Sequence, residues 1–418
     1  MMNRRSWLAG AGALAAGCAP REANVLRLWA MGREGEVAAD LVAGFEAEHP
    51  GVKVRIEQLP WTAAHEKLLT AFAGDATPDI AQLGNSWLPE FVALGALAPL
   101  DARVQATPDM PAADYFPGIW DTNRIGGALY GVPWYVDTRL LFYRRDLLAE
   151  AGFTAPPQRW DEWLAMLKAI KQRAGAERYA VLLPLNEYEP LVALGLQQAA
   201  PLLRDGGRFG NFSSPEFRRT WAFYLSLFEQ KLAPPASNNE IANLWNEFAR
   251  GYFSFYISGP WQIGEFRRRL PAALQGAWAT APLPGPDGPG ASIAGGSSLA
   301  VFRRSEQQDL AWELVRYLSR PAVQQRFHAI TGNLPPRRSA WGAIEGDAPT
   351  QAFRAQLERV KPTPQVPEWE RIATELRLVA ERTVRGLVAP DAALAEIDAR
   401  ADRLLEKRRW MLQRKGTP

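Results

Sequence analysis

The sequence predicts an α/β protein built from two lobes. Its 418 residues are too many for one ordinary compact domain, and 47% of them are hydrophobic, which is enough for large buried cores. Short runs typical of strands also alternate along the chain with longer segments of helical spacing. That order is typical of a lobe with a largely parallel sheet.

The first lobe is predicted to begin with strand, helix, strand, helix and strand. Apolar side chains alternate partly or strictly in the three short runs, and recur at helical spacing in the two longer segments. We expect residues 32–36 to form a loop between the first strand and the first helix. The strands are predicted at 25–31, 52–56 and 79–83, and the helices at 37–49 and 61–73.

The remainder of the chain repeats this style. A segment rich in Pro and Gly at 282–291 predicts a surface connection or hinge. Strands are predicted at 136–143, 179–185, 252–257 and 298–302, and helices at 160–173, 217–232, 241–250, 309–318 and through most of 372–409.

The amino-acid composition argues against several classes of function. The formal charge of +3 is small for this length, so there is no electrostatic footprint for nucleic acid. The three histidines are far apart and there is one cysteine, so the sequence predicts no zinc site and no internal disulfide. A metal held by carboxylates alone stays open, and no cofactor motif is present.

The N-terminal segment predicts export. Residues 1–17 place Arg4 and Arg5 before a short run of small and apolar residues, which is the pattern of a signal peptide. The run is too short to span a bilayer. The two arginines fit either a twin-arginine signal or an ordinary secretory signal.

Cys18 predicts a lipid anchor. Residues 14–18 resemble the lipobox of bacterial lipoproteins, in which the cysteine is lipidated and becomes the first residue. The pattern departs at Ala15, where a larger aliphatic residue is commoner, and cleavage at a small-residue site beside an incidental thiol is the alternative. Acyl chains on Cys18 would hold the protein at a membrane, with residues 18–24 as a short tether.

An ordered series of local motifs resembles one family. The pieces are Phe45-Glu46-Ala47-Glu48-His49-Pro50-Gly51-Val52-Lys53-Val54, then Thr77-Pro78-Asp79-Ile80, 94–100, Tyr130-Gly131-Val132-Pro133, 141–148, Trp160-Asp161-Glu162-Trp163, Gly259-Pro260-Trp261 and 332–337. Their order and spacing resemble family 1 extracellular solute-binding proteins, of which the maltose-binding proteins of ABC importers are the best-known relatives. The resemblance covers essentially the whole chain after Cys18.

The resemblance implies a type II periplasmic-binding-protein-like fold with a ligand cleft between two lobes. Crossing segments are expected near 134–138, within 282–295 and near 334–339. The N-terminal lobe would comprise 25–134 and 292–335, and the C-terminal lobe 138–282 and 340–418. The implied protein is an exported monomer in the periplasm or at the cell surface, which binds a carbohydrate of two or more units and delivers it to permease subunits without catalysing a reaction.

Sugars have apolar C–H faces and hydroxyl edges, so a sugar site needs aromatic platforms and carboxylates that accept hydroxyl protons. Trp261 and Trp369 match stacking positions of relatives. Asp137, at the first crossing, matches an acidic ligand residue. Glu187 follows the predicted strand at 179–185, where relatives also place a glutamate.

Other candidates lie in loops at strand ends. Ser86 and Trp87 follow the third strand, where relatives often carry an aspartate that is missing here, and Trp87 would compensate by stacking. Glu34 and Glu36 lie in the expected loop after the first strand, where relatives use charged residues, and one of the two, Glu34 or Glu36, is expected to contact the ligand. Gly296 and Ser297 would bring bare backbone up to the ligand. The remaining candidates are Tyr135, Trp245 and Arg337.

Each candidate has a structural alternative: packing for the tryptophans, a hinge salt bridge for Asp137, a solvated charge for Glu187 and a hinge turn for the glycine.

Other functions of the protein also stay open. The same fold could bind glycerol phosphate, a polyamine or a peptide. A glycosidase would need two carboxylates across the scissile bond, and Asp137 and Glu187 could supply them.

Overall fold

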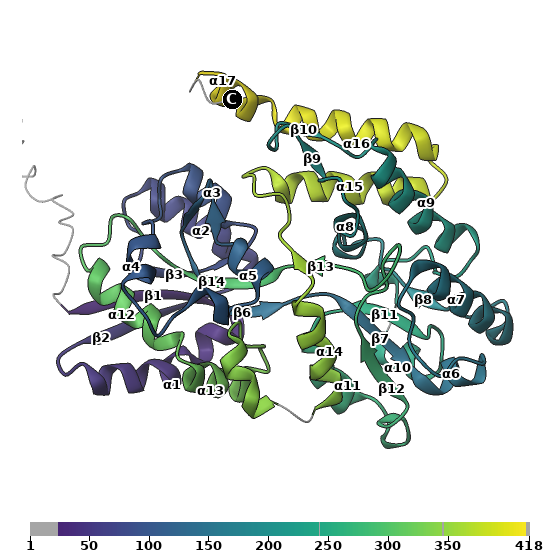
Figure 1. Ribbon diagram of the computed structural model, residues 1–418, viewed down its shortest axis with the longest axis horizontal. Coiled ribbons are helices and arrows are strands. Elements are labelled where there is room, and N and C mark those ends of the chain that lie inside the picture. Colours follow the sequence, from purple (N-terminus) through teal and green to yellow (C-terminus); the bar gives the residue numbers. More distant parts are fainter. Residues whose placement is uncertain (1–23, 242, 345–346, 415–418) are drawn as a thin grey trace, which may run out of the picture.

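The computed structural model describes residues 24–241, 243–344 and 347–414, which form two α/β lobes lying side by side (Figure 1). The predicted export signal and Cys18 lie outside these residues. Each lobe has its own sheet and its own buried apolar clusters. The predicted two-lobed α/β class is therefore confirmed.

The first lobe is built on a five-stranded sheet with the order β2-β1-β3-β14-β6. β1 pairs in parallel with β2 and β3, whereas β14 runs antiparallel to both β3 and β6. A strand from late in the chain therefore lies between strands formed by the first 137 residues. The bounds are β1 (Val25–Met31), β2 (Lys53–Leu59), β3 (Ile80–Gly84), β6 (Val132–Asp137) and β14 (Gly295–Val301).

Helices cover both faces of this sheet. α1 packs against α12 and α13 over one buried cluster that includes Leu28 and Phe45, and α2 packs over another that includes Leu68 and Phe91. The helices are α1 (Gly32–Glu48), α2 (Trp61–Ala73), α3 (Leu88–Ala93), α4 (Asp101–Gln105), α5 (Pro117–Asp121), α12 (Gln308–Leu318) and α13 (Pro321–Thr331), with a small hairpin of β4 (Arg124–Ile125) and β5 (Ala128–Leu129).

The expectation of a loop over 32–36 was wrong. α1 begins directly after β1, at Gly32, whose φ of +48° lets the chain turn sharply from strand to helix. Glu34 consequently lies in the first helical turn, where the helix dipole favours a carboxylate. The sequence concealed this because apolar spacing starts only at Val37.

The second lobe holds a four-stranded sheet with the order β12-β7-β11-β8. The strand predicted at 179–185 is reduced to two paired residues, because only they pair with β11. The strands are β7 (Leu140–Arg144), β8 (Val181–Leu182), β11 (Phe255–Ser258) and β12 (Trp278–Ala281), and β9 (Leu203–Arg204) with β10 (Phe209–Gly210) forms a separate hairpin.

The helices of the second lobe surround this sheet and continue to the end of the described chain. The tail predicted as helical over 372–409 forms three helices, α15 to α17, along the upper edge of the molecule in Figure 1. The helices are α6 (Arg145–Glu150), α7 (Trp160–Ala174), α8 (Glu189–Leu196), α9 (Pro215–Glu229), α10 (Leu244–Ala249), α11 (Trp261–Arg269), α14 (Ala348–Leu357), α15 (Trp369–Val384), α16 (Pro390–Leu404) and α17 (Glu406–Arg414).

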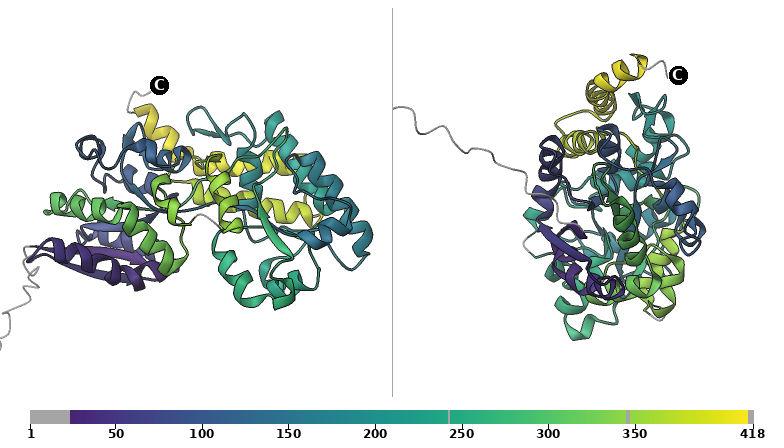
Figure 2. Two further views of the ribbon diagram at one scale, coloured as in Figure 1. Left: turned by 60° about the horizontal axis from the view of Figure 1, so that its bottom comes forward. Right: turned by 90° about the vertical axis from the view of Figure 1, so that its left-hand side faces the viewer.

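The two sheets are joined by extended segments that run across the middle of the molecule (Figures 1 and 2). The chain leaves β6 at Asp137 and enters β7 at Leu140. It returns through β13 (Ser292–Ile293), which leads into β14 and pairs in parallel with β15 (Val360–Lys361). Residues near Val136 also pair with Leu334. These extended segments place polar side chains between the lobes.

Candidate functional site

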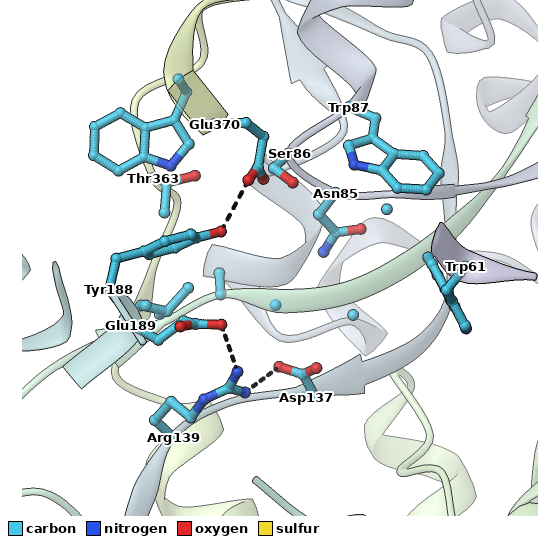
Figure 3. Close-up of a pocket in the computed structure, with 16 residues that line it drawn as sticks. Trp61, Asn85, Ser86, Trp87, Asp137, Arg139, Tyr188, Glu189, Thr363 and Glu370 are labelled. Carbon is cyan, nitrogen blue, oxygen red and sulfur yellow. Dashed lines mark hydrogen bonds and ion pairs between the residues drawn. The ribbon is translucent and has the colours of Figure 1, made fainter. Parts of the chain in front are cut away.

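A cleft of about 360 Å³ lies between the two lobes, with walls from both of them and a floor from the extended segments (Figure 3). The first lobe contributes the end of β3 and the start of α2, and the second contributes the starts of α8 and α15. The lining residues are Trp61, Gly84, Asn85, Ser86, Trp87, Asp137, Arg139, Tyr188, Glu189, Ile293, Ala294, Gly295, Gly296, Thr363, Trp369 and Glu370.

Arg139 is the centre of a charged network on the floor of the cleft. Its guanidinium donates to Asp137 Oδ1 at 3.4 Å and to Glu189 Oε1 at 3.0 Å (Figure 3). Its guanidinium carbon also lies 4.7 Å from the centre of the Trp261 ring. One cation therefore connects the crossing strand to α8 and to α11.

Burial raises the pKa of Asp137 above its ordinary value, with Arg139 opposing the shift and Glu189 adding to it. Burial likewise raises the pKa of Glu187, which lies just outside the cleft lining and accepts a hydrogen bond from Asn238. The two carboxyl groups are thus less acidic than solvated ones. Both remain acceptors for hydroxyl groups when ionised.

Tyr188 and Glu370, which are 182 residues apart in the sequence, are hydrogen-bonded in the wall that the second lobe contributes. The Tyr188 hydroxyl donates to Glu370 Oε2 at 3.0 Å (Figure 3). Burial, and then the nearby charge of Glu370, raise the pKa of Tyr188. The phenol therefore stays neutral and orients one oxygen of Glu370, while the other carboxylate oxygen remains an acceptor.

Aromatic rings form the wall of the first lobe. Trp61 and Trp87 meet edge to face, with ring centres 5.6 Å apart, and Trp87 also contacts the His65 ring at 5.1 Å. The His65 Nε2 atom lies 2.8 Å from Glu90 Oε2, which fixes the imidazole behind Trp87. Trp61 is 37% exposed, so much of its ring is accessible to a ligand.

Bare backbone at Gly295 and Gly296 completes the floor. Gly296 has a φ of +115°, and a Cβ there would meet the Tyr135 carbonyl oxygen at 2.3 Å. A Cβ on Gly295 would meet Asp137 Oδ1 at the same distance. Only glycine fits this pairing of β14 with β6, and its absence of a side chain also leaves room in the cleft.

Five of the twelve predicted site residues line the cleft. Ser86 and Trp87 come from the loop after β3, Asp137 and Gly296 come from the crossing strands, and Trp369 is the first residue of α15. Trp369 is only 1% exposed, so it presents little more than one edge to the cavity and also belongs to the core of the second lobe.

Three other candidates lie close to the cleft floor without lining it. Glu34 accepts a hydrogen bond from Asn333 Nδ2 at 2.7 Å. Burial, followed by the charges of Glu34 and Asp137, raises the pKa of Tyr135, which places the phenol near both carboxylates. Ser297 is fully buried and accepts from Gln82 Nε2 at 3.1 Å. These residues form a polar layer beneath the cleft.

Trp261 lines a neighbouring hollow of about 630 Å³ between α11 and the end of α13, together with His328 and Asn333. Its ring is 49% exposed, and Arg139 lies against it. Trp245 is further from the cleft: its Nε1 donates to Gln262 Oε1 at 3.1 Å, and the Arg269 guanidinium carbon lies 4.1 Å from its ring centre.

Arg337 is placed away from the cleft, in the packing of the first lobe. It is buried, and its guanidinium donates to Asp114 Oδ2 at 2.7 Å and to the carbonyl oxygens of Ser319 and Asp109 at 2.9 and 2.8 Å. All three of its donor nitrogens are therefore used within the protein.

Sequence reasoning missed five cleft residues that carry a ring or a charge. Two signals were present: Arg139 lies two residues after Asp137, and Tyr188 and Glu189 directly follow Glu187. Trp61 begins the predicted helix at 61–73, but it was not among the candidate site residues. Nothing in the sequence indicated Glu370, whose partner lies 182 residues away.

Within residues 24–241, 243–344 and 347–414, no helix is long and apolar enough to cross a membrane. In that same part of the chain, no group of three or more His, Cys, Asp or Glu side chains is placed to hold a metal ion.

A cleft between two α/β lobes, lined by rings and carboxylates from both, defines a solute-binding protein. The family model of bacterial extracellular solute-binding proteins matches residues 32–325, and the chain belongs to that family. This confirms the predicted family resemblance and, with the structures below, the periplasmic-binding-protein-like fold.

Solved structures and curated relatives agree with this assignment. The sugar-binding protein MalE from Xanthomonas citri is 54% identical, with a TM-score of 0.91 over 93% of this chain and 99% of that one. The GacH receptor of Streptomyces glaucescens is 25% identical, with a TM-score of 0.75 over 91% and 98%. The diacetylchitobiose binding protein DasA of Streptomyces coelicolor is 26% identical over 85% of this chain and 83% of its own length.

Proposed function

We propose that this protein is the substrate-binding component of an ABC importer and that it binds an oligosaccharide in the cleft between its lobes. The observation that carries the proposal is the composition of the cleft. Rings of Trp61, Trp87 and Tyr188 stand around the carboxylates of Asp137 and Glu189. Flat apolar surfaces and hydroxyl acceptors are the two features that a sugar requires.

The relatives support this ligand class. The Xanthomonas citri relative is described as a sugar-binding protein, GacH was solved in complex with acarbose, and DasA is described as a diacetylchitobiose binding protein. The first of these is also the most similar of the three in sequence. A carbohydrate is therefore favoured over glycerol phosphate, a polyamine or a peptide.

The proposed mechanism is binding coupled to closure of the lobes. A sugar that contacts Trp61 of the first lobe and Tyr188 of the second makes both sets of contacts only when the lobes approach each other. The closed form is therefore stabilised by the difference in affinity between the two forms. The extended segments at 137–140 and 293–295 are the short connections about which such a movement takes place.

A ligand screen by thermal shift tests the proposal. A ligand that binds only the folded protein raises its melting temperature, so we expect a neutral disaccharide or longer oligosaccharide to do so. Glycerol phosphate, spermidine and short peptides serve as the comparison set. A shift with a member of that set, and none with any sugar, would overturn the carbohydrate assignment.

We also propose that binding is not followed by chemistry. A glycosidase needs two carboxyl groups on either side of the bond that is cleaved, one of them a proton donor. Asp137 is instead paired with Arg139, an arrangement suited to holding a charge in place. Incubation of the purified protein with the ligand found in the screen, followed by chromatography, should return the ligand unchanged.

Export, lipidation at Cys18 and delivery to permease subunits complete the proposal. They rest on the resemblance of residues 1–18 to a lipoprotein signal and on membership of a family of extracellular proteins. A receptor held at the membrane would release its sugar close to the importer. The expected monomeric state can be measured by light scattering of the purified protein.

A further inference from the structure

The last helix, α17, presents a stripe of exposed side chains that sugar binding does not use. Lys407, Trp410, Met411 and Arg414 recur at three- and four-residue intervals, so they lie on one face of the helix. All four are exposed, Trp410 at 54% and Met411 at 39%. The Arg414 guanidinium carbon lies 4.4 Å from the centre of the Trp410 ring.

The opposite face of α17 is the one that fixes the helix to the protein. The Arg409 guanidinium carbon lies 4.7 Å from the centre of the Phe209 ring in the β9–β10 hairpin, and Arg409 donates to the Arg208 carbonyl oxygen at 3.0 Å. Leu405, which precedes the helix, is fully buried. The exposed stripe is therefore not required to hold α17 in place.

α17 shares one edge of the molecule with α2 and α15, each of which contributes its first residue to the cleft lining. In Figure 1, α17 lies at the upper edge, on the same side as α2 and α15, whose first residues are Trp61 and Trp369. α17 also lies at the top in both views of Figure 2.

We propose that the stripe on α17 contacts an anionic phospholipid surface. The stripe carries two cations, Lys407 and Arg414, on a helix with four Lys or Arg residues and one Glu, and cations near a membrane are attracted to anionic headgroups. An exposed tryptophan favours the interface between headgroups and acyl chains, and long basic side chains can extend from that depth into water. An apolar protein groove would instead leave Lys407 and Arg414 desolvated and unpaired.

This contact would orient the protein, because it adds a second point of attachment to the lipid proposed at Cys18. With attachment at Cys18 alone, nothing would fix the direction in which the cleft points. With α17 also at the membrane, the edge of the molecule that carries α2, α15 and α17 is turned toward the bilayer in which a permease would sit. The contact itself does not depend on the ligand being a sugar.

Vesicle co-sedimentation tests the proposal. The full chain carrying Cys18→Ser, so that no acyl chain contributes, is mixed with vesicles of equal parts phosphatidylcholine and phosphatidylglycerol or of phosphatidylcholine alone. We expect binding to the anionic vesicles only. The double variant Lys407→Gln with Arg414→Gln should bind about 25-fold more weakly, because each cation near the surface contributes about fivefold.

A matched variant removes the same charge elsewhere. Lys168→Gln with Arg173→Gln acts on two exposed residues of α7, at the far side of the second lobe, and should leave vesicle binding unchanged. Trp410→Ala should weaken binding at both low and high salt, whereas the contribution of the two cations should disappear at high salt.

Several results would overturn the proposal. One is equal loss of binding in the α7 and α17 double variants, since net charge alone would then explain it. Another is sedimentation with neither kind of vesicle, or equally with both. A third is binding to the anionic vesicles that neither Trp410→Ala nor the α17 double variant weakens, because another surface would then make the contact. Melting temperatures and sugar titrations of each variant report separately on folding and on the proposed function.

Discussion

The guanidinium carbon of Arg139 lies 4.7 Å from the centre of the Trp261 ring, so one side chain covers part of an exposed aromatic platform. The same guanidinium is held by Asp137 and Glu189, which keeps it in place over the ring. A ligand that stacks on this part of Trp261 has to displace Arg139 and break both ion pairs. Ligand stacking on this part of Trp261 is therefore coupled to the ion pairs of Arg139 on the cleft floor.

Removal of Arg139 should destabilise the fold. Arg139→Ala leaves Asp137 and Glu189 as two partly buried carboxylates without their shared partner, and we expect the free energy of unfolding to fall by about 1–3 kcal/mol. Adding Asp137→Asn to this variant should recover part of the loss. Urea denaturation of both single variants and the double variant measures the coupling, and additivity within about 0.5 kcal/mol would show that the network contributes nothing.

The raised pKa of Asp137 predicts a characteristic dependence of stability on pH. Because the folded protein binds this proton more tightly than the unfolded chain, the stability that Asp137 contributes is present below its unfolded pKa, about 4. It is lost as pH rises through the folded pKa. The unfolding free energy of the parent, relative to that of Asp137→Asn, should therefore fall as pH rises above about 4.

Asp287 provides a control of opposite sign. A hydrogen bond from Arg219 lowers the pKa of this exposed carboxyl, so its contribution is present above the unfolded pKa and lost as pH falls through the folded value. The difference in unfolding free energy between the parent and Asp287→Asn should therefore shrink as pH falls, instead of as pH rises. The same slope in both variants would contradict the assignment for Asp137.

Trp61 should matter for ligand binding more than for stability. Its ring is 37% exposed at the cleft wall, so Trp61→Ala removes a stacking surface without opening a cavity in the core. We expect affinity for the oligosaccharide to fall about tenfold, with little change in melting temperature. Trp410→Ala, which removes an exposed tryptophan away from the cleft, should leave affinity unchanged in the same calorimetric titration.

The charges of the cleft should select against acidic sugars. Three carboxylates line the cleft, those of Asp137, Glu189 and Glu370. The same lining contains one guanidinium, that of Arg139. An oligosaccharide that carries a uronate should therefore bind about tenfold or more weakly than its neutral counterpart. Glu189→Gln should narrow this gap, and added salt should narrow it further. Equal affinity for both ligands in low salt would contradict the prediction.

Cys18 lies outside the described residues, but its proposed lipidation can be tested directly. Cys18→Ser should move the protein from the membrane fraction to the soluble fraction, because acyl chains contribute about 0.8 kcal/mol per buried CH₂. Metabolic labelling with a fatty-acid analogue should label the parent and not the variant. Ala15→Leu, which brings residues 14–18 closer to the lipobox pattern, should leave labelling intact.

Much of the architecture could be predicted because strand and helix patterns are local. The strand over 25–31 and the helix over 61–73 have the predicted bounds. The start of α1 could not be predicted, since Gly32 was the only indication of the turn that begins the helix. The strand at 179–185 was predicted too long, because strand length depends on how many residues find a partner in β11.

The site was harder to predict because its pairings are not local. Trp87 could be proposed from its place after the third strand, and Asp137 from the family resemblance, which implies an acidic residue at the first crossing. The hydrogen bond between Tyr188 and Glu370, by contrast, joins residues that only the folded chain brings together. Arg337 resembled a candidate ligand in the sequence, but its three hydrogen bonds lie within the first lobe.

The place of β14 has a consequence for the order in which the protein can fold. This strand ends at residue 301 of 418 and lies between β3 and β6. Until it has been synthesised, β6 has no partner in the first sheet. The first lobe cannot be completed while the chain is still emerging through the second, so folding depends on distant contacts and should be slow. A delay of this kind keeps the chain unfolded for longer during synthesis, the state in which a chain can be threaded across a membrane.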